Sequence, residues 1–109
     1  YSLFGISNQF LKISSYFKAD YRKIIDAAKI DYPRMNSLPG PGLAAGPCLY
    51  KDTAQLSSAS DVYASIFREL IAVNESMPEF YVNNFIEKFR PPLNSKILLL
   101  GIYRFLNPV

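Results

Sequence analysis

Prolines and glycines are concentrated in residues 32–50, and this concentration restricts the possible folds more than any other feature. Proline fixes φ and removes a backbone donor, and glycine weakens helices, so no regular element should run through this stretch. The sequence therefore predicts a long loop here, and loops of this length are often functional. The prolines and glycines are Pro33, Pro39, Gly40, Pro41, Gly42, Gly46 and Pro47.

Apolar residues recur at intervals of three and four before this loop, which predicts a packed helix over residues 2–18. They are Leu3, Ile6, Phe10, Ile13 and Phe17. Asp20 is then expected to cap a second, short helix that ends before Tyr32-Pro33, because proline disfavours helix in the residue ahead of it. The inner face of this second helix is expected to carry Ile24, Ile25 and Ala28.

Two capping-box patterns predict further helix boundaries after the loop. Asp52, with Gln55 three residues later, predicts a helix that begins just after residue 52. Ser76-Met-Pro-Glu79 predicts that a longer helix from about Asp61 breaks and restarts there. The longer helix is expected to carry one apolar stripe of Val62, Ile66, Leu70, Val73 and Met77, and the restarted helix to bury Val82, Phe85, Ile86 and Phe89.

The C-terminal residues differ in pattern from the rest. Arg90-Pro-Pro92 reads as a linker, and residues 96–101 (Lys-Ile-Leu-Leu-Leu-Gly) read as a buried parallel strand. We therefore expect a mainly α fold: a central helical domain over residues 1–90, with a long first helix, and the first strand of a truncated α/β domain over residues 91–109.

Composition excludes several classes of function. The chain has no histidine, which excludes Ser-His-Asp and Cys-His chemistry and ordinary zinc sites, so no metal is expected. One cysteine, Cys48, cannot form an internal disulfide and indicates a reducing, cytoplasmic environment. The net charge of +3 is scattered, so no nucleic-acid partner is expected, and no apolar run approaches a membrane span. We expect the basic residues to form a solvated face: Lys12, Lys18, Arg22, Lys23 and Lys29.

Cys48 is the candidate nucleophile. If it lies a few residues before a helix start and near Lys51, both positive potentials favour the reactive thiolate, and Asp52 could orient a water. The glycine-rich loop before it could offer backbone N–H groups to anionic oxygens. A buried, inert structural cysteine in a turn is the alternative.

Five segments, in order, resemble the UDP-glucose/GDP-mannose dehydrogenase family. Residues 42–53 (Gly-Leu-Ala-Ala-Gly-Pro-Cys-Leu-Tyr-Lys-Asp-Thr) are similar to the family's Gly-Gly-x-Cys-x-x-Lys-Asp active-site loop. The other four resemble its central-helix Asn-Gln or Asn-Glu pair, its Tyr/His-Pro-Arg step, its Asn-x-x-x-Pro helix start and the first strand of its C-terminal domain. These segments are Asn8-Gln9, residues 31–34, residues 73–78 and residues 96–101.

The resemblance implies an NAD-dependent nucleotide-sugar 6-dehydrogenase. Such enzymes oxidise a sugar 6-hydroxymethyl group twice to a uronate through a cysteine thiohemiacetal and thioester. By position, Cys48 would be the nucleophile, Asp52 would assist water and proton transfer, and Lys51 would lie near the cofactor or the developing charge. Arg34 would reach the substrate of a partner subunit, and the UDP-sugar would also contact Asn36, Leu38, Pro39, Gly40, Gly42 and Gly46.

The same resemblance implies a homodimer formed through the helical domain, with NAD bound mainly by a domain upstream of Tyr1. The isolated chain should therefore be inactive. Ala45-Gly46 departs from the family's two glycines, and Phe105 stands where the family has lysine. Two other interpretations stay open: a non-catalytic helical dimerisation module with an inert Cys48, and a different, aldehyde-oxidising cysteine enzyme. Asn8 either faces solvent or caps a neighbouring loop, or else contacts substrate.

Overall fold

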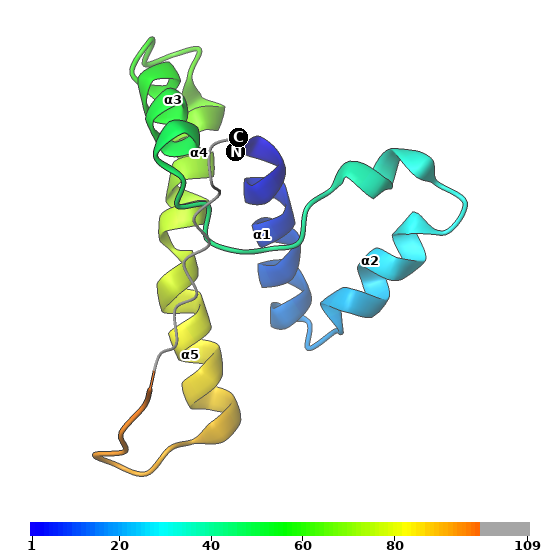
Figure 1. Ribbon diagram of the computed structural model, residues 1–109, viewed down its shortest axis with the longest axis vertical. Coiled ribbons are helices and arrows are strands. Elements are labelled where there is room, and N and C mark those ends of the chain that lie inside the picture. The colour runs from blue at the N-terminus through cyan, green and yellow to red at the C-terminus, as the bar shows by residue number, and fades with distance from the viewer. Residues whose placement is uncertain (99–109) are drawn as a thin grey trace, which may run out of the picture.

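The computed structural model describes residues 1–98, and their regular secondary structure is entirely helical (Figure 1). This confirms the predicted mainly α class. Half of the strand expected over residues 96–101 lies outside the described residues, so this strand stays a prediction. The helices are α1 (Ser2–Tyr16), α2 (Tyr21–Lys29), the 3₁₀ helix η1 (Pro33–Ser37), α3 (Pro47–Ser57), α4 (Ser65–Glu75) and α5 (Met77–Phe89).

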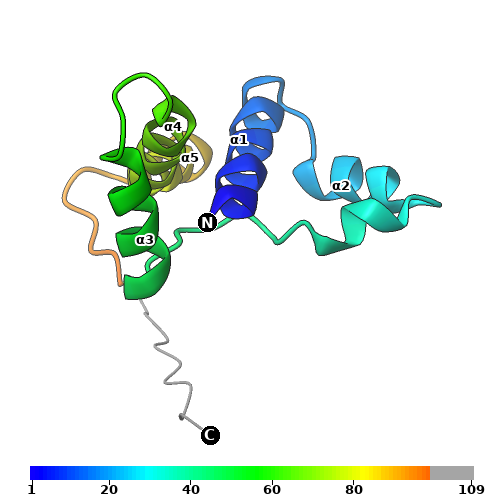
Figure 2. The ribbon, with the colours of Figure 1, turned by 90° about the horizontal axis from the view of Figure 1, so that it is seen from above.

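Helix α1 packs side by side with α4, and the two touch at Gly5 and Leu70. A Cβ atom at residue 5 would overlap the Leu70 Cδ2 atom, so the absence of a side chain at Gly5 lets the helices approach closely. Helix α3 also packs against α4, and α2 packs against α1 (Figures 1 and 2). The α1–α4 pair is therefore the centre of the molecule.

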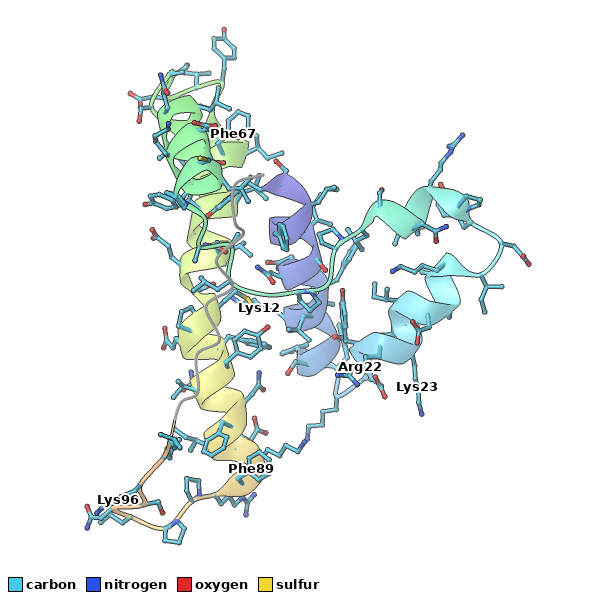
Figure 3. The ribbon with its side chains drawn as sticks, viewed as in Figure 1. Lys12, Arg22, Lys23, Phe67, Phe89 and Lys96 are labelled. Atoms are coloured by element: carbon cyan, nitrogen blue, oxygen red, sulfur yellow. The ribbon has the colours of Figure 1, made fainter. Side chains whose placement is uncertain are left out.

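Helices α4 and α5 follow each other in one column, with the predicted break at Ser76 (Figure 1). The prediction of a capping box was wrong, because the Ser76 hydroxyl does not cap α5 but donates to the Val73 carbonyl at 2.6 Å. The Lys12 ammonium reaches from α1 to this junction, where it donates to the Ser76 hydroxyl and lies over the Phe80 ring (Figure 3). Lys12 is thus half-buried rather than part of a solvated face.

Local signals predicted the start and the end of α2 correctly, but not its buried face. The Asp20 carboxylate accepts from the backbone N–H groups of Arg22 and Lys23, at 2.9 and 3.4 Å, as an N-cap does. Ile25 is the buried residue of this helix, whereas Ile24 and Ala28, expected on the inner face, are exposed. The helix ends at Lys29, before Tyr32-Pro33 as expected.

Two helix starts differ from the predictions. Helix α3 begins at Pro47, after the N-cap Gly46, rather than after Asp52, because proline at the first helical position needs no N–H partner. Helix α4 begins at Ser65 rather than near Asp61. The Arg68 guanidinium there donates to the carbonyls of Ser57, Ser60 and Asp61, which holds residues 61–64 in a turn.

The burial pattern of α1 is the largest correction to the sequence prediction. The buried residues of this helix are small or polar: Gly5, Ser7, Asn8 and Ser14. The predicted apolar seam (Leu3, Ile6, Phe10, Ile13 and Phe17) is exposed in the single chain, with Phe10, Ile13 and Phe17 lining a hollow of about 270 Å³ between α1 and α2. The opposite face of α1, which carries the small residues, packs closely on α4 and on the loop that leads into α3.

The apolar face of α5 is also exposed, against expectation. Met77 at its start is fully buried, but the residues predicted to point inward are solvent-accessible: Val82, Phe85, Ile86 and Phe89. Of the predicted stripe on α4, Leu70 is buried, Val73 is half-buried, and Val62 and Ile66 are exposed. Monomeric proteins rarely leave apolar areas of this kind exposed.

Candidate functional site

The predicted loop is a short 3₁₀ helix followed by an extended segment, residues 38–46, that crosses the α1–α4 pair and leads into α3 (Figures 1 and 2). The Ser7 hydroxyl donates to the Pro39 carbonyl at 2.7 Å and lies 2.8 Å from the Tyr21 hydroxyl. Ser7 therefore ties the beginning of this extended segment to both α1 and α2.

Two buried asparagine side chains hold the middle of the segment. Asn8 on α1 donates to the Gly42 carbonyl at 3.0 Å and accepts from the Gly42 N–H at 2.7 Å. Asn74 on α4 accepts from the Ala44 N–H at 2.8 Å and donates to the Ala44 carbonyl at 3.2 Å. The exposed fractions are 0% for Asn8 and 4% for Asn74. Asn8 thus binds the neighbouring loop, which is one of the roles expected for it.

Cys48 lies in the first turn of α3, one residue after Pro47, and it is exposed. This corrects the expectation that it precedes the helix, and it does not match a buried structural cysteine. Among residues 1–98, no side chain caps this helix start, and the helix dipole adds positive potential there.

Lys51 and Asp52 follow Cys48 on the same face of α3, because residues three and four apart in a helix are neighbours. The Lys51 ammonium lies 3.7 Å from the Asp52 carboxylate, and the two side chains are 73% and 68% exposed. An ion pair this exposed contributes little stability. The face therefore carries a thiol, an ammonium and a carboxylate that are exposed within the described part of the chain.

Helix α3 is fastened to α4 close to these groups. The Tyr50 hydroxyl donates to the Glu75 carboxylate at 3.1 Å, and this hydrogen bond, with the Glu75 charge, raises the pKa of Tyr50 above 10.0. Burial, followed by the same negative charge, raises the pKa of Tyr1. Thr53 is buried on the inner side of α3, where its hydroxyl donates to the Leu49 carbonyl.

The predicted substrate-binding residues do not form one site within the chain. Arg34 and Asn36 lie on η1, which sits beside α2 on the side of α1 opposite α3 (Figures 1 and 2). Leu38, Pro39 and Gly40 line a hollow of about 150 Å³ against α2. Gly42 lies at the Asn8 contact, and Gly46 caps α3, so these two glycines are the predicted binding residues closest in sequence to Cys48.

Sequence reasoning noticed Asn74 only as part of a motif and missed its contact with the loop. A usable signal was present: Asn74 lies four residues after Leu70 and three before Met77, so a polar side chain occupies the buried face of α4. A buried carboxamide needs a hydrogen-bond partner, and the loop backbone is that partner.

No protein-family model, curated protein or solved structure matches this chain. Among residues 1–98, no helix has the length and apolar character that crossing a bilayer requires. Within the same residues, no three acidic or cysteine side chains gather closely enough to hold a metal ion.

Proposed function

We propose that this chain is the central segment of an NAD-dependent nucleotide-sugar 6-dehydrogenase of the cytoplasm, with Cys48 as the nucleophile. The observation that carries this proposal is the shared face of Cys48, Lys51 and Asp52 at the start of α3. All three side chains are exposed, and the loop that leads into the helix is held by hydrogen bonds from two buried asparagines. The segments that resemble the dehydrogenase family add to this argument.

The chemistry assigned to this chain consists of two steps at Cys48. In the first, the thiolate adds to the C6 aldehyde carbon, so a C–S bond forms and the carbonyl electron pair moves to oxygen. In the last, water attacks the thioester carbon, the C–S bond breaks, and the thiolate leaves while Asp52 accepts the proton of the water. The N–H groups of the first turn of α3 stabilise the negative oxygen in both steps.

NAD⁺ would supply the two hydride transfers: one forms the aldehyde before the thiolate adds, and the other follows the addition and leads to the thioester. A dinucleotide is usually held where a strand turns into a helix, and residues 1–98 contain no strand. The proposal therefore assigns the NAD site to another part of the protein, with Lys51 as the one residue of this chain near it. It follows that the isolated chain does not oxidise UDP-sugars.

The substrate side of the proposal needs a second subunit. Arg34 and Asn36 lie across α1 from Cys48, so they would serve the site of a partner, while the remaining contacts of the UDP-sugar come from residues 38–46. The exposed apolar seam on α1 and the exposed face of α5 provide surface for such a homodimer. The same surface also favours the second candidate, a dimerisation module in which Cys48 is inert.

Turnover of UDP-sugars by the full-length protein tests the proposal directly. UDP-glucose and UDP-N-acetylhexosamines are offered with NAD⁺, and NADH and the uronate are measured. We expect two NADH for each uronate, and a loss of at least about a thousandfold in turnover for Cys48→Ala. Asp52→Asn should lower turnover without changing stability by more than about 0.5 kcal/mol. Full turnover by Cys48→Ala would refute the proposal.

Alkylation of Cys48 separates the candidates. An activated thiol reacts well below the usual thiol pKa of about 8.5, whereas ordinary or slow labelling in the full-length protein supports the inert module. If a UDP-sugar slows the alkylation of Cys48 and a simple aldehyde does not, the protein is not a different aldehyde-oxidising cysteine enzyme. Cys48 is the chain's only cysteine, so Cys48→Ala is the matched control for labelling elsewhere in the protein.

A further inference from the structure

The extended segment before α3 is held in the way a strand is held by its neighbour in a sheet, but by side chains. Gly42 and Ala44 each use both backbone groups, the N–H and the carbonyl, on the two ends of one carboxamide. Alternate residues of an extended chain present these groups along the same edge. Asn8 and Asn74 thus occupy the place of a neighbouring strand.

The contact between α1 and α4 explains why these two positions reach one edge. Asn8 follows Gly5 by three residues and Asn74 follows Leu70 by four, so each lies one helical turn beyond the point where the helices touch. The close approach at Gly5 brings both carboxamides under the same extended segment. Their near-complete burial leaves little room for water to replace them.

Asparagine is the side chain that fits both halves of this contact. A carboxamide carries a donor and an acceptor side by side, so it can pair with the N–H and the carbonyl of one residue, whereas an ionised aspartate only accepts and leucine does neither. A buried peptide group that loses its partner is costly, so replacing either asparagine should release the segment. The contact is therefore specific to the amide and not merely to polarity.

We infer that Asn8 and Asn74 are positioning residues: together they fix residues 42–44 and thereby set where α3 begins and how it presents Cys48. Ala45 and Gly46 alone separate the Ala44 contact from the first residue of α3, so a displaced Ala44 displaces the helix start. We call the hydrogen bonds of Asn8 to Gly42 and of Asn74 to Ala44 the clamp. The clamp is observed directly in the structure, while the significance of Cys48 rests on the proposed function. Neither asparagine touches the reacting atoms in this inference.

Hydrogen exchange in the full-length protein tests the clamp without any substitution. The N–H groups of Gly42 and Ala44 donate to the asparagines, whereas those of Leu43 and Ala45 make no hydrogen bond within residues 1–98. Exchange read at single-amide resolution should therefore alternate along the segment, with residues 42 and 44 slower by about tenfold to a hundredfold. Equal exchange at all four residues would overturn the clamp.

Asn74→Asp tests the carboxamide chemistry. The carboxylate still accepts from Ala44 N–H but repels the Ala44 carbonyl, so the segment loosens at neutral pH. In acid the protonated side chain regains a donor beside its acceptor, and protection of residue 44 should return. Asn83→Asp, on an exposed side chain of α5, is the matched control and should show neither effect. Tyr1, Tyr50 and Glu75 are the titratable groups around Asn74, and both variants retain them.

Steady-state kinetics of the full-length protein then test positioning. We expect Asn74→Asp to lower kcat for UDP-sugar oxidation by about tenfold to a hundredfold with little change in KM for NAD⁺, and kcat to recover in acid relative to Asn83→Asp. An unchanged kcat alongside lost protection at residue 44 would overturn the positioning role. If the parent shows alternating exchange but oxidises no UDP-sugar, the proposed function fails while the clamp stands.

Discussion

Gly5 on α1 lies against Leu70 on α4 with no space for a Cβ atom between them. This contact determines more than the packing of two helices. Because Asn8 and Asn74 each lie one turn further along, the distance between the helices at Gly5 also decides whether both carboxamides can reach residues 42–44. A change at residue 5 is therefore expected to act on the loop as well as on stability.

Substitution of Gly5 by valine tests the close approach. The three added carbons have to displace the buried Leu70 side chain, and overpacking of this kind costs about 1–3 kcal/mol in the free energy of unfolding. Urea denaturation measures the loss. Ala72→Val adds two carbons at an exposed position of α4 and should cost much less. Equal losses in the two variants would contradict the contact.

The Asp20 cap offers a second test, confined to one helix. Asp20→Ala removes the acceptor for the N–H groups of Arg22 and Lys23 and should lower the free energy of unfolding by about 1 kcal/mol. Asp26→Ala removes the same charge from an exposed position inside α2, where alanine favours helix, so it should be neutral or slightly stabilising. Thermal unfolding of both variants compares the cap with the charge alone.

The raised pKa values of three tyrosines predict that the protein loses stability at alkaline pH. Tyr1 and Tyr81 have pKa values raised chiefly by burial, and Tyr50 has a pKa raised by its hydrogen bond to Glu75. A folded-state pKa above the unfolded value of 10.0 means that the folded protein holds the proton more tightly. Their contribution to stability is therefore complete below about pH 10 and is lost as the pH rises through the folded pKa.

Tyr50→Phe isolates one part of this effect. Without a hydroxyl at residue 50, the decline of the unfolding free energy above pH 10 should be shallower than in the parent, as followed by urea denaturation at several pH values. Tyr63→Phe changes an exposed tyrosine in the turn before α4 and should leave the slope unchanged. A parent curve that is flat above pH 10 would contradict the assignment.

The exposed seam of α1 predicts self-association. Ile13→Glu introduces a charge into the apolar seam beside the hollow lined by Phe10 and Phe17, so the full-length protein should shift from dimer to monomer while staying folded. Sedimentation at micromolar concentration and circular dichroism measure the two properties. Val62→Glu, an equally apolar-to-acidic change on the turn before α4, should leave the dimer intact. A monomeric parent would refute the dimer.

Local sequence signals were reliable where one side chain or one proline acts on its own backbone. Asp20 caps α2, and the chain breaks at Ser76 ahead of Pro78. The start of α3 was mispredicted because two signals compete within six residues: proline after glycine at 46–47, and the capping pattern at Asp52. Packing of α3 on α4, fastened by Tyr50 and Glu75, favours the earlier start.

The sequence by itself determined the helical class, because its apolar periods and its proline–glycine stretch leave few other folds, and it singled out Cys48, Lys51 and Asp52 as neighbours. Tertiary structure decided which face of α1 is buried. Periodicity reports where apolar side chains lie on a helix but not what covers them. The close approach of α4 at Gly5 selects the face of α1 that is buried. The backbone groups of the extended segment need hydrogen-bond partners, so Asn8 and Asn74 are buried beneath it and the apolar seam stays exposed.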